Sequence, residues 1–254
     1  MTFDIIILSH MKDHNKLPFL INSIRKFIVG YNEIFIITPK IPDKKIDGLN
    51  YITDDTSLVM RKETKLKWDN WVNNNNFNRQ KHSWIKQQFI KLFNNVSNND
   101  YLIIDSDILF LKEINITIDN KPTFFLGRNQ MTQEYFNFSK KIMSQEKKFN
   151  WSFISELMFF KKHIIKDMIE KKFNGDYNNF IEKSIEIMSD DCFISEFELY
   201  GNYTYENFKD VYRYEKINYL LNGKNDQWSD EEIKKYLENN KNREYDIISL
   251  HSWN

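Results

Sequence analysis

The sequence predicts an α/β fold, and three segments near its start carry this prediction. Phe3–Leu8 is an unbroken apolar run of strand length, typical of a strand buried on both faces of a parallel sheet. Apolar residues then recur at helical spacing from Leu17 to Ile28, and Glu33–Thr38 is a second apolar run that ends at Pro39. Strand, helix and strand in this order indicate parallel strands joined by helices, with functional loops at the carboxyl ends of the strands.

The rest of the chain continues with short apolar strands and amphipathic helices. Ser83 is suited to cap a helix whose inward face carries Trp84, Ile85, Gln88, Phe89, Leu92 and Phe93. Residues 54–78 are polar and poorly periodic, and residues 191–210 are aromatic and acidic. Further strands are predicted at Leu49–Thr53, Tyr101–Ile104, Ile108–Leu111, Thr123–Leu126 and Asp246–Leu250, and further helices at residues 132–145, 152–172, 177–190 and 230–239.

The sequence contains no internal repeat and no linker rich in Pro, Gly or Ser. We therefore expect residues 1–254 to form one domain, with a mostly parallel central sheet flanked by helices.

Composition excludes several classes of function. The chain carries 36 Lys and Arg against 36 Asp and Glu, so it lacks the basic surplus with which proteins hold nucleic acid or anionic membranes. Its single cysteine, Cys192, cannot form an internal disulfide, which favours a reducing compartment. We expect a cytoplasmic protein, because no basic region precedes the first apolar run and no apolar stretch is long enough to span a membrane.

Glycine-rich phosphate-binding motifs and Gly-x-Ser-x-Gly do not occur in the sequence. P-loop, dinucleotide-binding and serine-hydrolase functions therefore lack their motif.

Two carboxylates interrupt the apolar stretch Tyr101–Leu111, at Asp105 and Asp107. Burying unpaired carboxylates is costly, so these side chains are expected at a strand end, facing a cation, a group of donors or solvent. Carboxylate oxygens are hard ligands suited to Mg²⁺ or Mn²⁺, and such an ion can bridge to a diphosphate. The alternative is a tight turn in which the Asp side chains bond their own backbone.

The helix that precedes this motif offers a second candidate. Gln88 shares the inward face with Trp84 and Phe89, whereas Lys86 and Lys91 are expected to point elsewhere. A buried amide needs hydrogen-bond partners, which lie either in the sheet or in a bound nucleotide.

Two further acids stand in apolar or aromatic surroundings, Glu156 and Glu196. Such surroundings raise a carboxyl pKa and exclude water, which suits a general base for an acceptor hydroxyl or a group that orients a sugar. The alternative is that each acid pairs with a lysine or caps a helix. Asp191 is a secondary base candidate, and it otherwise forms a helix-boundary pair with Asp190.

Four segments, spread over most of the chain, share one resemblance: Trp84–Leu92, Tyr101–Phe110, Phe153–Phe160 and Phe193–Tyr203. Together they resemble the metal-dependent GT-A nucleotide-sugar glycosyltransferases, and most of all a branch found in bacterial surface-polysaccharide loci and large viruses. The resemblance implies a single Rossmann-like GT-A domain. Its nucleotide-binding half would cover about residues 1–112, and its acceptor and sugar-binding half about residues 113–254.

The resemblance also implies individual roles. Asp107 would ligate the metal directly, and Asp105 would support the ribose or the metal through water. His251 fits the place of a third ligand, which would favour Mn²⁺ over Mg²⁺; otherwise it is a frayed terminal histidine. Ser9 and His10 follow the first strand, where such folds bind the base and ribose, and the alternative for His10 is that it caps or solvates a loop.

The expected function is transfer of a sugar from a nucleotide-sugar to the hydroxyl of a glycan or other acceptor. A UDP-sugar is the favoured donor and a GDP-sugar the second choice, while the stereochemistry and the oligomeric state stay open. One alternative is an aspartate-dependent phosphohydrolase, although that class carries its motif at the first strand, with Thr or Val where Leu109 stands. The other is a non-catalytic nucleotide- or glycan-binding domain of the same fold.

Overall fold

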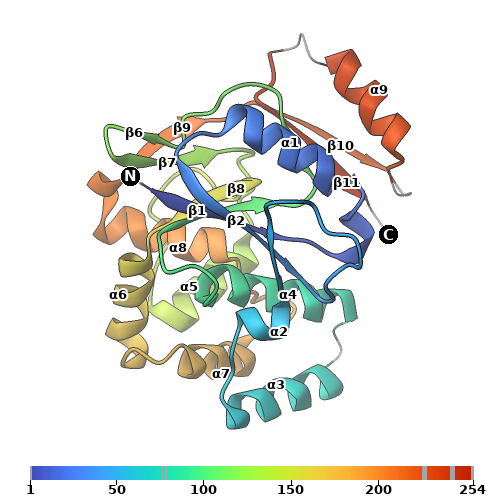
Figure 1. Ribbon diagram of the computed structural model, residues 1–254. Helices are drawn as coiled ribbons and strands as arrows, with labels where there is room; N and C mark the ends of the chain where they lie inside the picture. The colour runs from blue at the N-terminus through green and yellow to red at the C-terminus, as the bar shows by residue number, and fades with distance from the viewer. Residues whose placement is uncertain (1, 76, 78, 225–227, 241–243, 253–254) are drawn as a thin grey trace.

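A five-stranded sheet lies at the centre of the computed structural model, which describes residues 2–75, 77, 79–224, 228–240 and 244–252 (Figure 1). Its strand order is β3-β2-β1-β4-β8. The first four strands in this order run parallel to one another, and β8 is antiparallel to β4. The α/β class is therefore confirmed, with a mixed central sheet. Its strands are β1 (Phe3–Leu8), β2 (Tyr31–Thr38), β3 (Asn50–Thr53), β4 (Tyr101–Asp105) and β8 (Leu157–Phe160).

The direction of winding changes between β1 and β4. The chain moves outward from β1 to β2 and β3, and then returns to place β4 on the other side of β1. In the register of this pair, Leu8 lies opposite Asp105, so the two strands end side by side. Such a topological switch point leaves a crevice outside the carboxyl ends of the strands, which is where open α/β sheets bind ligands.

Helices cover both sides of the central sheet, with α1 on one side and α4 and α8 on the other (Figure 1). Helix α1 buries Leu17, Leu20, Ile21 and Ile24, and Pro18 fits its first turn because the backbone N–H groups there have no partner within the helix. The helices are α1 (Leu17–Phe27), α2 (Asp54–Ser57), α3 (Lys62–Asn74), α4 (Arg79–Phe93), α5 (Gln133–Met143), α6 (Lys162–Phe173), α7 (Tyr177–Ile187), α8 (Glu196–Asn207) and α9 (Asp230–Asn240), with single 3₁₀ turns η1 (Met11–Asp13) and η2 (Lys209–Val211).

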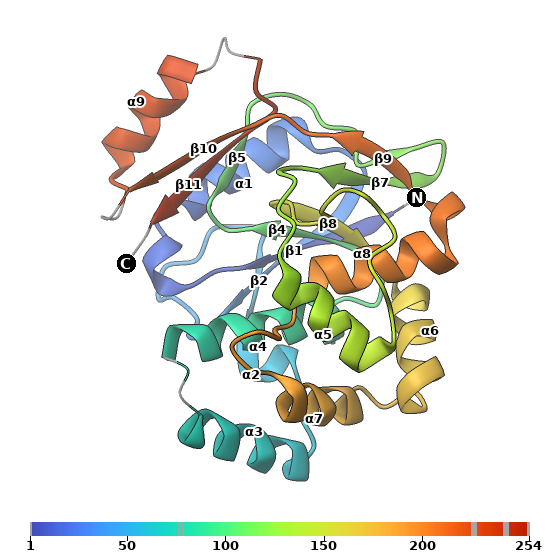
Figure 2. The same cartoon turned by 180° about the vertical axis from the view of Figure 1, so that it is seen from behind.

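Two small sheets complete the fold (Figure 2). One has the order β10-β11-β5, in which β11 is parallel to β10 and antiparallel to β5. Because β5 directly follows the Asp-Ser-Asp turn, this pairing brings the end of the described chain back to that turn. The other sheet has the order β6-β7-β9. These strands are β5 (Ile108–Phe110), β6 (Thr117–Ile118), β7 (Lys121–Leu126), β9 (Arg213–Lys216), β10 (Tyr219–Lys224) and β11 (Ile247–Ser252).

The single helix expected over residues 152–172 is wrong. Strand β8 occupies Leu157–Phe160, and only the part from Lys162 onward is helical. All four residues of β8 are buried, so the segment has no polar face with which to show a strand period. An apolar run of this kind cannot be distinguished from part of a buried helix by periodicity alone.

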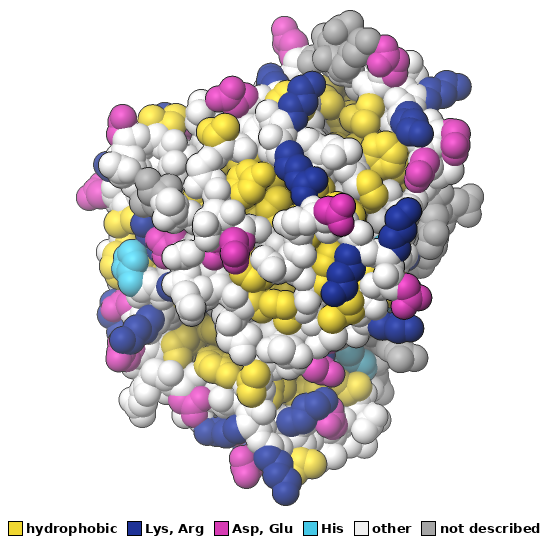
Figure 3. Space-filling view, viewed as in Figure 1, with side chains coloured by type: hydrophobic (Ala, Val, Ile, Leu, Met, Phe, Trp, Pro, Cys, Tyr) yellow, Lys and Arg dark blue, Asp and Glu magenta, His cyan; other side chains and the backbone are white. Residues whose placement is uncertain are grey.

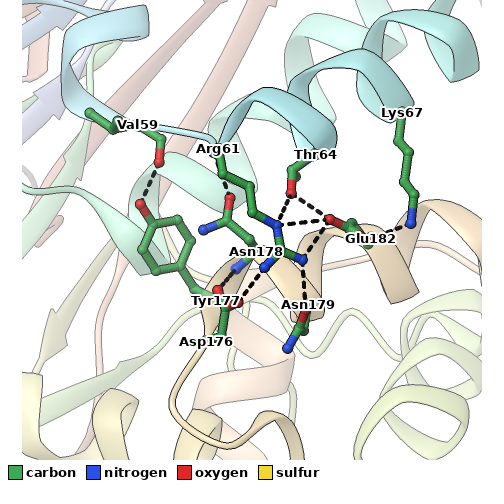
Figure 4. Close-up of polar contacts among 9 residues, drawn as sticks. All are labelled: Val59, Arg61, Thr64, Lys67, Asp176, Tyr177, Asn178, Asn179 and Glu182. Carbon is green, nitrogen blue, oxygen red and sulfur yellow. Dashed lines mark hydrogen bonds and ion pairs between the residues drawn. The ribbon is translucent and has the colours of Figure 1, made fainter.

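Polar contacts dock α3 on α7 (Figure 4). The guanidinium of Arg61 lies 2.7 Å from the Asp176 carboxylate, 2.8 Å from that of Glu182 and 2.7 Å from the side-chain oxygen of Asn179. Hydrogen bonds, the strongest from Lys67, lower the pKa of Glu182 to about 2. These polar contacts add to the packing of the buried Trp68 against Phe89 in holding α3 in place. Residues 54–78 thus form α2 and α3 although they show little apolar periodicity.

Charged side chains of both signs are interspersed over the face seen in Figure 3. This distribution agrees with the equal numbers of acidic and basic residues in the chain. Among the described residues, no helix is long and apolar enough to cross a membrane.

Candidate functional site

A pocket of about 730 Å³ opens at the carboxyl ends of the central strands, and we call it the strand-end pocket. Its lining comes from the segments that follow β1 and β2, from α4, from residues 105–107 and from β11. It therefore lies at the switch point between β1 and β4. Its volume is within the range of about 300–1,000 Å³ that is usual for small-molecule sites.

Asp105 lines this pocket as the last residue of β4. Its backbone N–H donates to the carbonyl of Glu156 at 3.0 Å, and its carboxylate Oδ1 lies 2.9 Å from the Lys91 Nζ. Burial raises the pKa of Asp105, and although Lys91 opposes this effect, the charges of Glu156 and Asp107 add to it. Negative charge is thus concentrated around the Asp-Ser-Asp turn.

His251 lies between two of these acids. Its Nδ1 is 2.8 Å from Asp107 Oδ2, and its Nε2 is 3.7 Å from Glu156 Oε1 and 3.0 Å from Ser249 Oγ. Burial lowers the pKa of His251, but hydrogen bonds with Asp107 and Glu156 outweigh burial and raise it to about 10. Burial raises the pKa of Asp107, yet the same imidazole lowers it overall. At neutral pH this histidine is therefore a cation held between carboxylates.

The donor set suits a hard divalent cation, although its side chains are not arranged around one point. Asp105, Asp107 and Glu156 supply carboxylate oxygens and His251 supplies an imidazole, which together favour Mn²⁺ or Mg²⁺. No group of three or more His, Cys, Asp or Glu side chains in the described part of the chain is spaced to hold a metal ion. His251 would have to lose its proton before its ring could act as a ligand.

Lys91 is a site residue that the sequence analysis missed. The expectation that it points away from the inward face is wrong, because its Nζ lies 2.9 Å from Asp105 Oδ1 and 2.8 Å from Glu196 Oε1. Burial opposes its charge, but Asp105 and Glu196 outweigh burial and raise the pKa of Lys91. Residues 84, 88 and 91 follow the i, i+4, i+7 spacing of one helix face, and that spacing was the available signal.

The three other candidates for nucleotide contact all line the strand-end pocket. Ser9 is buried, and its hydroxyl donates to the carbonyl of His10 at 3.4 Å. The imidazole of His10 accepts from the backbone N–H of Lys12 at 3.4 Å, so it caps η1, as the alternative for this residue had it. The buried Gln88 amide donates to the carbonyl of Trp84 at 3.2 Å, and its Oε1 accepts from the backbone N–H of Glu196 at 3.5 Å, so it has partners within the protein, as its alternative had it.

The three candidate bases lie in different environments. Glu156 is next to Asp105 and faces His251, with 13% of its side chain exposed. Glu196 is almost fully buried and is paired with Lys91, which matches the lysine-pairing alternative. Asp191 is exposed and bonded by the Ser189 hydroxyl at 2.5 Å, a contact that lowers its pKa. None of the three is among the residues that line the strand-end pocket. The structure thus brings Glu156 and Glu196 to the Asp-Ser-Asp turn and leaves Asp191 outside it.

Comparison with known proteins supplies a family. A family model with the description "Family of unknown function (DUF6492)" matches residues 2–236 of the chain. A search of curated proteins finds no match.

Proposed function

The chain belongs to the DUF6492 family, and we propose that it is a metal-dependent glycosyltransferase of the GT-A type. It would transfer a sugar from a nucleotide-sugar, with a UDP-sugar favoured over a GDP-sugar, to an acceptor hydroxyl. One observation carries the proposal: Asp105 and Asp107 line a pocket of nucleotide size at the point where the winding of the sheet reverses. The proposal is strengthened by the convergence of Lys91, Glu156 and His251 on the same two carboxylates.

The lining of the strand-end pocket offers the groups that a nucleotide requires. Trp84, which is partly exposed, would supply apolar surface for a base, and Ser9 and Gln88 would supply hydrogen-bonding groups. This division between apolar walls and a few polar groups is the usual composition of a small-molecule site.

Asp105 and Asp107 would hold the divalent ion, with His251 as the third protein ligand once its imidazole is neutral. When bound, such an ion supplies positive charge to the departing nucleoside diphosphate. The chain itself positions Asp105 for this role through the ion pair with Lys91. That lysine also limits the repulsion between Asp105 and the neighbouring acids.

Glu156 is the stronger base candidate. Glu196 is 2% exposed and already paired with Lys91, so a substrate hydroxyl has no direct approach to its carboxylate. Glu156 is less enclosed and lies beside Asp105. In an inverting reaction its carboxylate would take the proton of the acceptor hydroxyl as that oxygen attacks the anomeric carbon.

Calorimetric titration of UDP, GDP and their sugars tests this function. We expect binding that strengthens with Mn²⁺ in the parent and in the control Asp43→Asn, which alters an exposed loop residue, and little response to Mn²⁺ in Asp107→Asn. Absence of nucleotide binding, or binding that ignores Mn²⁺, would contradict the proposal.

Two further measurements separate the alternatives. Hydrolysis of a phosphomonoester that is lost in Asp105→Asn would indicate a phosphohydrolase. Nucleotide binding without sugar transfer or donor hydrolysis, over a broad acceptor panel, would indicate a non-catalytic domain.

A further inference from the structure

A second pocket, of about 600 Å³, lies where the ends of β7 and β9 meet the start of β10, and we call it the tyrosine pocket. Figure 2 shows β9 leading into β10 beside β11. The linings of the tyrosine pocket and the strand-end pocket share no residue. The tyrosine pocket is lined by Gly127, Arg128, Asn218, Tyr219, Glu244 and Tyr245, together with the buried Ile217.

One wall of the tyrosine pocket is built by a close approach that requires a glycine. A Cβ on Gly127 would lie only 2.9 Å from Cε1 of Tyr219 and 3.4 Å from the carbonyl oxygen of Ile154. The backbone N–H of Arg128 donates to the Tyr219 hydroxyl at 3.1 Å, and the Trp151 indole N–H donates to the Gly127 carbonyl at 3.3 Å. The phenol ring is therefore held in place as a fixed aromatic surface.

The polar side chains at the rim are available to a ligand. The guanidinium of Arg128 lies 5.9 Å from the centre of the Tyr219 ring and makes no ion pair with any residue that the structure describes. The side chains of Asn218 and Glu244 likewise have no hydrogen-bond partner within the described ranges. Arginine, amide and carboxylate groups together provide both donors and acceptors, with charges that cancel.

This chemistry matches a saccharide. Aromatic faces provide apolar surface for the C–H face of a sugar ring, and planar polar side chains can bond its hydroxyls. A nucleoside diphosphate would instead require an excess of positive charge, because each phosphate carries negative charge. Arg128 and Glu244 both line the tyrosine pocket, and because their charges are opposite they do not provide that excess.

The tyrosine pocket also adjoins the segment that carries Glu156. Ile154, whose carbonyl approaches Gly127, lies two residues before Glu156, and the backbone of Glu156 is bonded to Asp105. We propose that the tyrosine pocket binds the saccharide acceptor and presents one of its hydroxyls toward Glu156, an inference that rests on the proposed function.

In an inverting transfer, the hydroxyl oxygen forms the new bond to the anomeric carbon, and the bond from that carbon to the phosphate oxygen breaks. The electron pair leaves with the nucleoside diphosphate, and the hydroxyl proton passes to the Glu156 carboxylate.

Binding of the fluorescently labelled full chain to a printed array of neutral and acidic oligosaccharides tests the pocket directly. We expect the parent protein to bind to a subset of the printed glycans. Arg128→Ala and Tyr245→Ala should each weaken that binding about tenfold or more, the scale of one lost charged hydrogen bond or one lost aromatic contact. Arg213→Ala is the matched control, because Arg213 pairs with Glu215 outside the pocket. This variant should bind the same glycans as the parent does.

The outcomes distinguish this inference from the proposed function. If the parent binds no glycan, or if the parent and both pocket variants bind glycans equally well, the proposal of an acceptor pocket is overturned. Calorimetric binding of UDP with Mn²⁺ is measured on the same proteins and should be unchanged in Arg128→Ala and Tyr245→Ala. If UDP fails to bind while glycan binding still depends on Arg128, the pocket is a saccharide site and the glycosyltransferase proposal alone fails.

Discussion

At the scale of single residues, two cations balance the acids around the Asp-Ser-Asp turn. Lys91 lies between Asp105 and Glu196, and protonated His251 lies between Asp107 and Glu156. Each carboxylate therefore has one cationic neighbour, and this arrangement offsets the cost of bringing four acids together.

Lys91→Met should be strongly destabilising. Removing one partner of a buried ion pair leaves uncompensated charge, and we expect the free energy of unfolding to fall by about 3–5 kcal/mol. Lys65→Met is the matched control, because Lys65 pairs with Asp69 at the surface of α3, and it should cost about 1 kcal/mol or less. Urea denaturation followed by circular dichroism measures both values. Equal urea midpoints for the two variants would show that the ion pairs of Lys91 do not stabilise the fold more than a surface ion pair does.

The imidazole of His251 should remain protonated well above neutral pH. Its folded-state pKa of about 10 exceeds the ordinary value of 6.5, so its contribution to stability is complete below pH 6.5 and is lost as pH rises toward 10. The difference in unfolding free energy between the parent and His251→Gln should therefore shrink over that range.

Imidazole nitrogen shifts measured by NMR check the same prediction directly. Asp107→Asn should lower the titration midpoint of His251, while His82, whose pKa is lowered by burial, serves as the internal comparison. A His251 midpoint at or below that of His82 would contradict the ion pair.

At the scale of elements, β11 and α8 position the site. Antiparallel pairing with β5 sets the register of β11, and the buried Lys16 Nζ donates to the Leu250 carbonyl at 2.8 Å, which ties β11 to the loop after β1. Helix α8 carries Glu196 at its start and packs against the segment before Glu156. The contact between α8 and that segment depends on Gly201, because a Cβ there would collide with the Phe153 ring.

Gly201→Ala should therefore lower stability although alanine favours helices. Overpacking a tight contact costs about 1–3 kcal/mol, which for a chain of this size lowers the thermal midpoint by roughly 2–12 °C. Glu206→Ala is the control, since Glu206 is on the same helix in a surface ion pair and should change stability by about 0.5 kcal/mol or less. A midpoint for Gly201→Ala at or above that of the parent would mean that Phe153 moves aside without cost.

At the scale of the whole molecule, acidic and basic residues are equal in number, so the chain has no net positive charge with which to attract anions. Any binding of an anion therefore depends on the groups at the binding site itself. The strand-end pocket carries acids and lysines together, so a diphosphate needs an added cation to bind among them. In the proposed function that cation would lie at the Asp-Ser-Asp turn, where the central sheet is joined to the β10-β11-β5 sheet.

Nucleotide and metal together should raise the stability of the whole chain. A ligand at a hundred times its dissociation constant stabilises the folded state by about 2.7 kcal/mol, or roughly 5–10 °C in thermal midpoint. We expect this shift with UDP and Mn²⁺, its loss on adding EDTA, and its absence in Asp107→Asn but not in Asp43→Asn. Differential scanning calorimetry measures the shift, and an equal rise in Asp107→Asn would rule out metal-bridged nucleotide binding at this turn.

Strands β1, β2 and β4 were predictable because each is an apolar run bounded by polar residues. Since Asp105 comes directly after the predicted run Tyr101–Ile104, its place at the end of a strand was predictable too. Strand β8 was not predictable, since its neighbours on both faces hide its period. Lys91 could have been found from helical spacing, but nothing in the sequence shows that its charge meets two acids rather than solvent.

Local sequence alone determined that carboxylates follow a buried strand, because an apolar strand must end where polar groups can be solvated or paired. Only the tertiary structure decided their partners. His251 lies 144 positions from Asp107 and reaches it through the pairing of β11 with β5, and Tyr219 meets Gly127 through the pairing of β7 with β9. Such contacts depend on strand order and register, which arise from the packing of the whole chain rather than from any one segment.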